Sequence, residues 1–400
     1  MRDVIILGST GSIGTQALDV ISRNPDAFRV VGLGAGGGNV ALLAEQIAAF
    51  RPRLVAVATW DAAKALARAL HEAGVGVHEV AVGHGDAAME ALAASPCDVV
   101  LNGITGAAGL KPTLATLRAG TTLALANKES LVIGGRLVTS AAAPGQLVAV
   151  DSEHSALAQA LRAGARGEVR RLILTASGGP FRGRTREELA DVTPDQALAH
   201  PTWTMGRVVT INSSTLMNKG LELLEAALLY DVDVDDITVV VHPTSDVHSM
   251  VEFCDGATIA QASPPDMRLP IALGIAWPDR VPDASPTYDW SVPRTWSFEP
   301  LDDEAFPAVN LARRCGKAAG TAPAVFNAAN EVCVDAFCDG RLPYLGIVAT
   351  VSAVVDEHLA GTAASASGRH VGDDELTVDA VLAADAWARE RASELTGTPR

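Results

Sequence analysis

Apolar and polar positions along residues 1–150 follow a regular order of short runs and longer periodic stretches. Short runs rich in β-branched and aliphatic residues predict strands at residues 4–7, 28–33, 54–58, 98–101, 121–126 and 147–150. Stretches with apolar residues three or four positions apart predict helices, among them residues 40–50, 62–71, 87–94 and 110–118. This order is typical of a parallel sheet covered by helices, so ligands are expected beyond the carboxyl ends of the strands.

The pattern changes after residue 150. Strands predicted at residues 170–175, 237–242, 248–253 and 258–262, with a helix at about 215–230, indicate a second α/β domain with a mixed sheet over residues 151–277. Residues 278–309 contain prolines and little periodicity, as a linker does. Helical patterns at residues 324–339, 345–359 and 376–395 predict a helical bundle over residues 310–400. The predicted fold class is therefore α/β with a C-terminal helical domain.

Residues 178–207 interrupt the second domain with a polar stretch rich in proline and glycine. A loop of this length in a compact domain is typically a lid. His200 and Trp203 lie near its end, where a tryptophan covers an apolar part of a ligand and a histidine binds phosphate or transfers a proton. The alternative for both side chains is a structural role.

Composition narrows the classes of partner. A net charge of −16 repels nucleic acid and acidic membranes, so any phosphate site has to be local. The five cysteines are scattered and odd in number, which indicates reduced thiols in a cytoplasmic protein rather than a disulfide framework. The apolar run at residues 4–7 is too short for a signal sequence, and no stretch has the length of a membrane helix.

A glycine turn, Gly8-Ser9-Thr10-Gly11-Ser12-Ile13-Gly14, connects the first predicted strand to a helix. Its glycines allow a tight turn and let N–H groups at the helix start bind a pyrophosphate, which predicts a Rossmann-like dinucleotide-binding domain. A turn that only packs helix on strand is the alternative. The second strand leads into Gly34-Ala35-Gly36-Gly37-Gly38-Asn39. An NAD site carries an acid there, so the absence of one favours NADP.

Four carboxylates have spacings that suit a metal site. Asp151 and Glu153 follow a predicted strand, and in extended backbone they point to one face. Glu222 and Glu225 are three positions apart on a predicted helix and share a face. Without a cluster of histidines or cysteines, such a set suits Mg²⁺ or Mn²⁺. His154 alternates away from Asp151 and Glu153, so we expect it to be structural.

Hydroxyl, amide and amino groups in the same region suit a phosphate. Ser177 precedes two glycines, and Ser213, Asn218 and Lys219 lie near the start of the helix that carries Glu222. Helix capping is the alternative for the serines. Lys128 follows a strand end in Asn127-Lys128-Glu129-Ser130 and is a candidate ligand contact, with an ordinary solvated lysine as the alternative.

Seven ordered motifs resemble those of the 1-deoxy-D-xylulose 5-phosphate reductoisomerase family over nearly the whole chain. They are Gly8–Gly14, Asn127–Ser130, Asp151–His154, Ser177–Phe181, His200–Arg207, Met217–Glu222 and Phe326–Glu331. The resemblance implies a homodimeric enzyme that uses NADPH and Mg²⁺ or Mn²⁺. Such an enzyme rearranges 1-deoxy-D-xylulose 5-phosphate, by a retro-aldol/aldol route or an α-ketol shift, and reduces the product to 2-C-methyl-D-erythritol 4-phosphate.

The resemblance also implies roles for individual residues. The metal ligands would be Asp151, Glu153 and Glu222, with Glu225 close by. Ser177, Ser213, Asn218 and Lys219 would hold the phosphate with His200 closing over it, while Ser152, Lys128 and Trp203 would contact the rest of the substrate. The NADPH contacts would be Thr10, Gly11, Ser12, Ile13, Gly36, Asn39, Asn127, Glu129 and Gly206.

The chain departs from the family at Gly37-Gly38, where many members have a lysine or arginine before the asparagine. Two other functions remain open from the residues alone. A semialdehyde dehydrogenase shares the glycine turn but needs a thiol after the nucleotide domain, and no cysteine lies between Cys97 and Cys254. A non-catalytic NADP-sensing protein would not need the four carboxylates.

Overall fold

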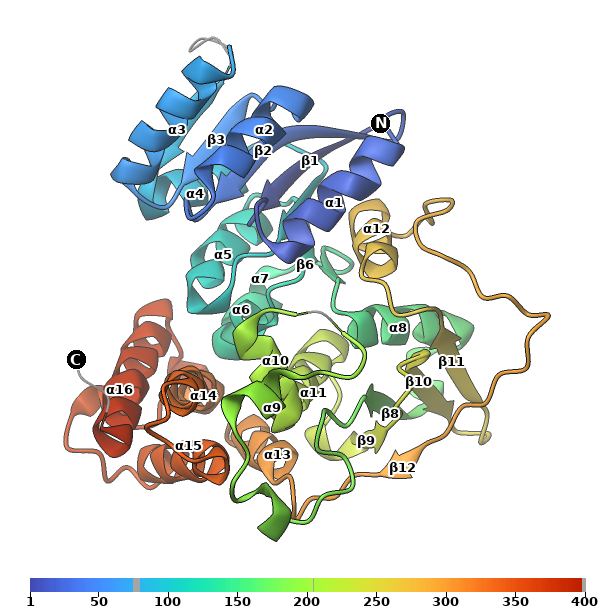
Figure 1. Cartoon of the computed structure of the whole chain (residues 1–400), viewed down its shortest axis with the longest axis vertical. Coiled ribbons are helices and arrows are strands. Elements are labelled where there is room, and N and C mark those ends of the chain that lie inside the picture. The colour runs from blue at the N-terminus through green and yellow to red at the C-terminus, as the bar shows by residue number, and fades with distance from the viewer. Residues whose placement is uncertain (75–79, 204, 398–400) are drawn as a thin grey trace. The chain divides into compact units, whose positions relative to one another are not determined.

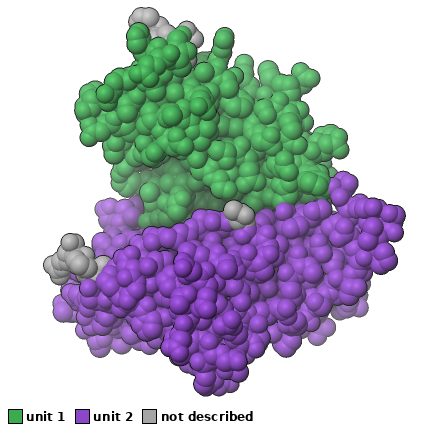
Figure 2. All heavy atoms as spheres, viewed as in Figure 1, with its two compact units in different colours: residues 1–130, 140–155, 266–286 green, residues 131–139, 156–265, 287–400 purple. Residues whose placement is uncertain are grey.

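The computed structural model describes residues 1–74, 80–203 and 205–397, which form two compact units (Figure 2). Unit 1 comprises Met1–Ser130, Ser140–Ser155 and Asp266–Pro286. Unit 2 comprises Leu131–Thr139, Ala156–Pro265 and Thr287–Arg400. The chain therefore passes between the units several times, and three of these passages lie within the helices α6 (Lys128–Gly134), α7 (Arg136–Ala141) and α8 (Ser152–Ala160).

Unit 1 contains a seven-stranded sheet in the order β4-β3-β2-β1-β5-β6-β7, and every neighbouring pair is parallel. The strands are β1 (Arg2–Leu7), β2 (Phe28–Ala35), β3 (Leu54–Val57), β4 (Ala81–His84), β5 (Val99–Asn102), β6 (Thr122–Leu125) and β7 (Leu147–Ala149). The order reverses between β1 and β5, which is the point where ligands bind in open parallel sheets. The predicted Rossmann-like architecture is confirmed.

Helices complete unit 1. They are α1 (Ser12–Arg23), α2 (Val40–Phe50), α3 (Trp60–Glu72), α4 (Gly85–Ala93), α5 (Leu110–Arg118) and α12 (Arg268–Ala276). Buried residues of α1, α2, α3 and α12 join the sheet in one hydrophobic core. Helix α12 comes from the far end of the central sequence, and the Arg2 guanidinium donates to the Ile275 carbonyl at 3.1 Å. The core of unit 1 thus needs residues beyond the first 150.

Unit 2 is built on a mixed five-stranded sheet in the order β11-β10-β8-β9-β12, as expected from the sequence. The strands are β8 (Val169–Ala176), β9 (Ile237–Val241), β10 (Val247–Phe253), β11 (Thr258–Ala262) and β12 (Glu299–Pro300). Strands β8 and β9 are parallel, and the other pairs are antiparallel. The parallel pair β8 and β9 requires a crossover, and α11 (Met217–Tyr230) lies within it.

Helices α9 (Pro194–Leu198) and α10 (Arg207–Ser214) precede α11, and four longer helices follow the sheet (Figure 1). These are α13 (Ala308–Ala318), α14 (Ala322–Cys338), α15 (Tyr344–Leu359) and α16 (Val378–Thr396); α7 (Arg136–Ala141) lies at a passage between the units. One hydrophobic core extends from Leu174 of the sheet through Leu221 of α11 to Phe326 of α14. The predicted central and C-terminal regions therefore share a core, while their boundaries at residues 277 and 310 stay predictions.

The segment predicted as a lid contains regular structure, contrary to expectation. Leu189 and Ala197 are fully buried in the core of unit 2, and the Thr193 hydroxyl group caps α9. Burial of these residues needs contacts with distant parts of the chain, which local periodicity does not reveal. Thr204, near the end of the predicted lid at residues 178–207, and residues 398–400 of the predicted C-terminal domain lie outside the described residues.

Candidate active site

The glycine turn between β1 and α1 has the geometry expected of a dinucleotide site. Gly8 has φ +83°, and a methyl group on Gly14 would lie 2.4 Å from the Gly8 carbonyl oxygen. The N–H groups of Gly8 and Ser9 donate to the Gly34 carbonyl at 2.8 and 2.9 Å, which fixes the turn against β2. Helix α1 begins at Ser12 with no side-chain cap, so its first N–H groups suit a pyrophosphate.

The loop after β2 is built from Gly36 to Asn39. Gly37 has φ +95°, and a methyl group there would lie 2.4 Å from the Ala62 side chain. A methyl group on Gly36 or Gly38 would meet no described atom within 4 Å. The Asn39 side-chain oxygen accepts a hydrogen bond from the Leu42 N–H at 3.1 Å and caps α2. The loop is therefore open at Gly38 and closed at Gly37.

Asn127, predicted to contact NADPH, is 2% exposed and holds two segments of unit 1 together. Its side-chain amide donates to the Ile104 carbonyl and, at 3.1 Å, to the Gly106 carbonyl. Its side-chain oxygen accepts from the Ser130 N–H at 2.6 Å. Asn127 thus ties the loop after β5 to the first turn of α6, which also carries Lys128 and Glu129.

Asp151, Ser152 and Glu153 lie together at the start of α8. The Asp151 carboxylate accepts from the Ser152 N–H at 2.9 Å, and the Ser152 hydroxyl donates to Glu153 at 2.6 Å. Oxygens of Asp151 and Glu153 lie within 4.8 Å of each other. Lys128 forms an ion pair with Asp151, and both side chains are more than four-fifths buried. Unit 1 therefore holds a half-buried carboxylate pair with a lysine beside it.

Asp151 and Glu153 do not lie on extended backbone, so the prediction that they share the face of a strand is wrong. Strand β7 ends at Ala149, and α8 begins at Ser152. The two carboxylates approach each other because Asp151 directly precedes the helix and Glu153 lies in its first turn, near the positive end of the helix dipole. His154 is fully buried in the same turn.

Three segments of unit 2 form the predicted phosphate site. Ser177 follows β8, and its hydroxyl accepts from the Gly179 N–H at 3.2 Å. A methyl group on Gly179 would lie 2.9 Å from the Ser213 carbonyl oxygen, so this turn packs directly on the end of α10. The His200 imidazole lies 3.1 Å from the Ser177 hydroxyl. The structure thus brings Ser177, Ser213 and His200 together from positions far apart in the sequence.

The hydrogen bonds of His200 determine its tautomer. The N–H groups of Thr202 and Trp203 both donate to Nδ1, at 3.1 and 2.9 Å. Nδ1 is therefore unprotonated, and the neutral ring carries its proton on Nε2, which faces the Ser177 hydroxyl. Burial lowers the pKa of His200 below its ordinary value of 6.5. His200 consequently offers a neutral N–H donor to this site near pH 7.

Helix α11 carries the remaining predicted groups of unit 2. The turn at Leu216, with φ +59°, separates α10 from α11, so the predicted single helix from residue 215 is wrong at its start. Helix capping, the alternative for the serines, does not occur at the start of α11, where no side chain caps the helix and the Ser214 hydroxyl donates to the Ile211 carbonyl at 2.7 Å. The left-handed residue Leu216 takes the capping position instead.

Asn218, Lys219 and Glu222 contact one another on α11. The Asn218 amide donates to Glu222, and Lys219 forms an ion pair with it. Lys219 and Glu222 expose only 4% and 2% of their surfaces, and Glu225, one turn later, is fully buried. Burial of a carboxylate costs several kcal/mol of folding free energy unless a cation offsets it, so the buried charges of α11 lower the stability of the fold. Buried charged side chains of this kind are typical of a ligand-binding site rather than of a helix face that only packs against the core.

The donor sets fit a hard divalent cation. Within unit 1, Asp151 and Glu153 offer carboxylate oxygens beside Lys128. Within unit 2, Glu222 offers carboxylate oxygens beside Lys219, and each lysine offsets the negative charge next to it. Oxygen donors of this kind are those that Mg²⁺ and Mn²⁺ prefer. His248, packed 6.3 Å from the Trp203 ring, is held by Ser263 and takes no part in these carboxylate sets.

The cysteines do not support the alternative function of a semialdehyde dehydrogenase, which needs a reactive thiol. Burial raises the pKa of Cys97 to about 11, so this thiol stays protonated near neutral pH. All five cysteines are free thiols, and burial raises the pKa of Cys315 and Cys333 to about 12.

None of the helices in the described part of the chain combines the length and apolar character needed to cross a membrane.

Family models match three successive parts of the chain. Residues 4–135 match the model of 1-deoxy-D-xylulose 5-phosphate reductoisomerase, residues 147–230 match a C-terminal domain of the same enzyme, and residues 262–391 match a further C-terminal domain of it. The glycine turn, Asp151, Glu153, Ser177 and Glu222 all lie within the matched residues.

Curated relatives are similar over almost their full length. A 1-deoxy-D-xylulose 5-phosphate reductoisomerase of Cutibacterium acnes is 68% identical over 400 residues, covering 99% of this chain and 98% of the relative. One of Streptomyces coelicolor is 61% identical, covering 98% and 92%.

Solved structures of reductoisomerases are similar to this chain in fold over almost its full length. The Zymomonas mobilis reductoisomerase in complex with NADPH has a TM-score of 0.88 and 39% identity, covering 100% of both chains. A DOX-P reductoisomerase in complex with NADPH, fosmidomycin and magnesium has a TM-score of 0.90 and 33% identity, covering 99% of this chain and 98% of that one.

Proposed function

The chain belongs to the 1-deoxy-D-xylulose 5-phosphate reductoisomerase family, and from this premise we propose how its residues divide the reaction between them. It is an NADPH- and magnesium-dependent enzyme that converts 1-deoxy-D-xylulose 5-phosphate to 2-C-methyl-D-erythritol 4-phosphate. The observation that best supports this proposal is that Ser177 contacts His200, and that Gly179 packs against the Ser213 carbonyl group, in unit 2. NADPH oxidation that depends on both the sugar phosphate and a divalent ion tests it.

Residues 1–150 supply all of the proposed NADPH contacts except Gly206. The pyrophosphate lies on the turn of Thr10, Gly11, Ser12 and Ile13, where α1 starts without a side-chain cap. The remaining proposed contacts are Gly36, Asn39, Asn127, Glu129 and Gly206. Asn127 acts through its neighbours, since its side chain is occupied in holding the loop at Ile104 and Gly106 to α6.

The loop at Gly37-Gly38 predicts where cofactor preference can be strengthened. Gly38→Lys is expected to tighten NADPH binding by about three- to tenfold without tightening NADH binding, because a cation near the 2′-phosphate adds a charged hydrogen bond. Position 38 has room for a side chain, whereas Gly37 has a positive φ and lies against Ala62. The dissociation constants of NADPH and NADH for Gly38→Lys measure the effect, with Gly37→Lys as the strained control. Equal gains for both cofactors would refute it.

The substrate phosphate is held in unit 2 by Ser177, Ser213, Asn218 and Lys219, with His200 closing over it. The serine hydroxyls and the His200 Nε2–H donate to phosphate oxygens, and Lys219 supplies the positive charge in a chain of net charge −16. Residues 178–207 are the proposed lid of the central domain, residues 151–277, and Leu189 and Ala197 anchor this segment in the core of unit 2. Trp203 covers the carbon skeleton and excludes water.

The tautomer of His200 predicts how substrate binding depends on pH. A proton on Nδ1 would remove both backbone hydrogen bonds, so the turn keeps them as pH falls below 6.5 and loses them as pH falls through the lowered pKa of His200. We expect the KM for substrate to rise as pH falls through this range, and more steeply in the wild type than in His200→Gln. The variant is the control for titration of the substrate phosphate itself. Parallel profiles would contradict the assignment.

Asp151, Glu153 and Glu222 are the proposed metal ligands, with Glu225 in support and Mn²⁺ as an alternative to Mg²⁺. These carboxylates would hold a divalent ion, which when bound would supply Lewis-acid chemistry to the substrate carbonyl and a neighbouring hydroxyl group. Ser152 and Lys128 hold the substrate diol, and their contacts with Glu153 and Asp151 orient those carboxylates. Both the retro-aldol/aldol route and the α-ketol shift are compatible with these residues.

We propose that the enzyme is a homodimer in the cytoplasm. Trp290, Val292, Trp296 and Phe298 of the proposed linker expose 37–71% of their surfaces, a concentration of apolar surface that usually marks an interface. Free thiols are typical of the cytoplasm. Light scattering is expected to give twice the mass of one chain, and Trp290→Ser with Trp296→Ser is expected to shift it toward the monomer. A wild-type monomer at micromolar concentration would rule out the dimer.

A further inference from the structure

Ser213, a proposed phosphate ligand, lies at the end of α10 between two residues that are held by the C-terminal helices of unit 2. This position matters because the left-handed turn at Leu216 lies between Ser213 and the pair Asn218 and Lys219, so it sets how these proposed phosphate ligands are placed relative to one another. A corner that binds phosphate tightly has to keep this geometry before the substrate arrives. The contacts that hold Ser213 in place therefore affect the affinity for substrate phosphate as well as the stability of the fold.

The residue before Ser213 is held by α14. The Asn330 side-chain amide donates to the Asn212 side-chain oxygen at 2.9 Å, across 118 positions of sequence. Both asparagines are buried, at 0% and 4% exposure. A buried amide pair of this kind is strongly directional, since misalignment would leave polar groups without partners in an apolar core. Asn330 thereby orients the last turn of α10.

The residue after Ser213 is held by α15. The Tyr344 hydroxyl donates to the Ser214 carbonyl at 2.6 Å, and the tyrosine is 3% exposed. The ring of Tyr344 also packs edge-on against Phe181, with centroids 5.2 Å apart. Phe181 ends the Ser177–Phe181 motif, so one side chain of α15 contacts both the Ser177 segment and the Ser213 segment of the proposed phosphate site.

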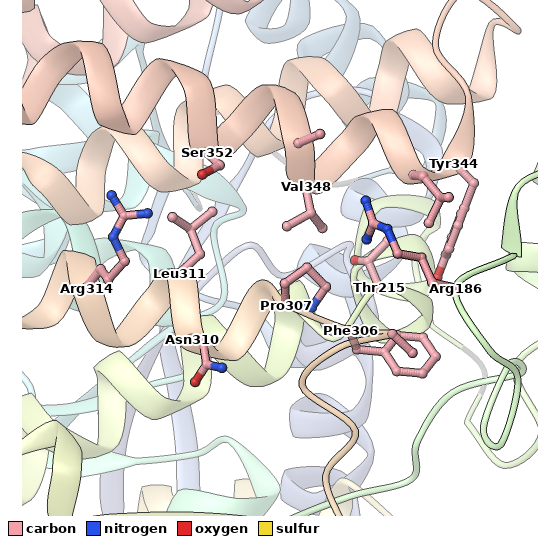
Figure 3. A pocket seen from close by; sticks show the side chains of 13 residues that line it. Arg186, Thr215, Phe306, Pro307, Asn310, Leu311, Arg314, Tyr344, Val348 and Ser352 are labelled. Atoms are coloured by element: carbon pink, nitrogen blue, oxygen red, sulfur yellow. The ribbon is translucent and has the colours of Figure 1, made fainter.

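The turn that follows Ser213 is not closely packed on every side, because Thr215 borders a cavity. Thr215 and Tyr344 line a cavity of about 240 Å³ between α13 and α15, together with Phe306, Leu311 and Val348 (Figure 3). An incompletely packed wall gives the turn fewer van der Waals contacts than a filled core would. Bonds from the Thr215 N–H and hydroxyl group to the Ile211 carbonyl hold the turn within α10, while Asn330 and Tyr344 hold it from other helices.

We propose that Asn330 and Tyr344 are positioning residues for substrate phosphate, which act by holding Asn212 and Ser214 on either side of Ser213. The inference rests on the proposed role of Ser213 and gives the C-terminal helices a part in substrate affinity. Neither residue touches the phosphate. Each sets the backbone from which Ser213, Asn218 and Lys219 reach it.

The variants Asn330→Ala and Tyr344→Phe test this directly. Loss of one directional hydrogen bond is expected to raise the KM for 1-deoxy-D-xylulose 5-phosphate by about fivefold or more, with the inhibition constant of inorganic phosphate rising in parallel. The kcat is expected to change by less than about twofold, and the dissociation constant of NADPH not at all, because both depend on other residues. Tyr344→Phe keeps the ring and its packing, so it remains informative if Asn330→Ala folds poorly.

The matched control is Asn327→Ala on the same helix. Asn327 is buried to 1% exposure, but its side-chain amide donates to Glu331, also on α14, at 2.9 Å. We expect Asn327→Ala to destabilise α14 without raising the KM or the phosphate inhibition constant. If Tyr344→Phe left both constants at their wild-type values, or if Asn327→Ala raised them as much as Asn330→Ala, the positioning role would be refuted.

Ser213→Ala separates this inference from the proposed phosphate site. An increase of both constants in Ser213→Ala, Asn330→Ala and Tyr344→Phe supports the two together. An increase in Ser213→Ala alone overturns the positioning role and leaves the phosphate site standing. Wild-type constants in Ser213→Ala, with increases in the other two, would overturn the premise that the contacts act through Ser213.

Discussion

Glu222→Gln is expected to lower kcat by about 1,000-fold while the dissociation constant of NADPH stays at its wild-type value. The substitution keeps the shape of the side chain and its hydrogen bond from Asn218, but it removes the charge that a divalent ion requires. NADPH binding depends on the glycine turn of unit 1, in which Glu222 has no part. Steady-state NADPH oxidation and NADPH fluorescence titration measure the two quantities.

Glu225→Gln is the matched control for this prediction. Glu225 is fully buried one turn further along α11, so both variants remove one buried charge from the same helix. We expect Glu225→Gln to lower kcat by only about tenfold, as for a group that supports the ligands rather than binding the metal. Thermal unfolding shows whether Lys219 without its ion-pair partner destabilises the fold. A Glu222→Gln enzyme with near-normal kcat would show the metal assignment to be wrong.

Gly14→Ala is expected to weaken NADPH binding by about 100-fold or more and to leave binding of inorganic phosphate unchanged. The added methyl group would lie 2.4 Å from the Gly8 carbonyl oxygen and 2.5 Å from the Ser9 Cα atom. Both are backbone atoms held by hydrogen bonds to Gly34, so α1 has to move away from the turn. The N–H groups at its start would then no longer reach the pyrophosphate.

Gly11→Ala gives the graded comparison. A methyl group there would lie 3.3 Å from the same carbonyl oxygen, a contact that a shift of a few tenths of an ångström relieves. We expect a loss of NADPH affinity well below that of Gly14→Ala. If the two variants bound NADPH equally well, steric closure of the turn at Gly14 would not be what makes the site. Inorganic phosphate inhibition reports on unit 2 and checks that the variants are folded.

Much of unit 1 could be predicted because its signals are local. The strand, glycine turn and helix at residues 2–23 follow one another without interruption, and the buried runs at residues 4–7 of β1 and 99–101 of β5 are wholly apolar. Strand β4 escaped prediction because its residues are exposed or half-buried and lack an apolar pattern. Helix α12 was missed as a part of unit 1, since its place depends on packing with residues more than 200 positions away.

The candidate site was predictable in its residue types but not in all of its geometry. Asp151 and Glu153 were grouped for the wrong reason, because the sequence does not reveal that a helix begins at Ser152. The turn at Leu216 was missed because left-handed backbone is uncommon for leucine and carries no sequence signal. Asn330 and Tyr344 lie more than 100 positions from the residues they hold, and a polar pair on an apolar helix was the only local sign of Asn330.

In the proposed reaction, NADPH bound by unit 1 supplies the hydride, Asp151, Glu153 and Glu222 bind the metal, and Ser177, Ser213, Asn218 and Lys219 of unit 2 bind the substrate phosphate. NADPH oxidation with 1-deoxy-D-xylulose 5-phosphate, measured with Mg²⁺, with Mn²⁺ and with a chelator, tests this claim most directly. We expect turnover to 2-C-methyl-D-erythritol 4-phosphate with either ion and none with the chelator. Turnover that persisted without a divalent ion, or the absence of turnover with both ions, would contradict the account.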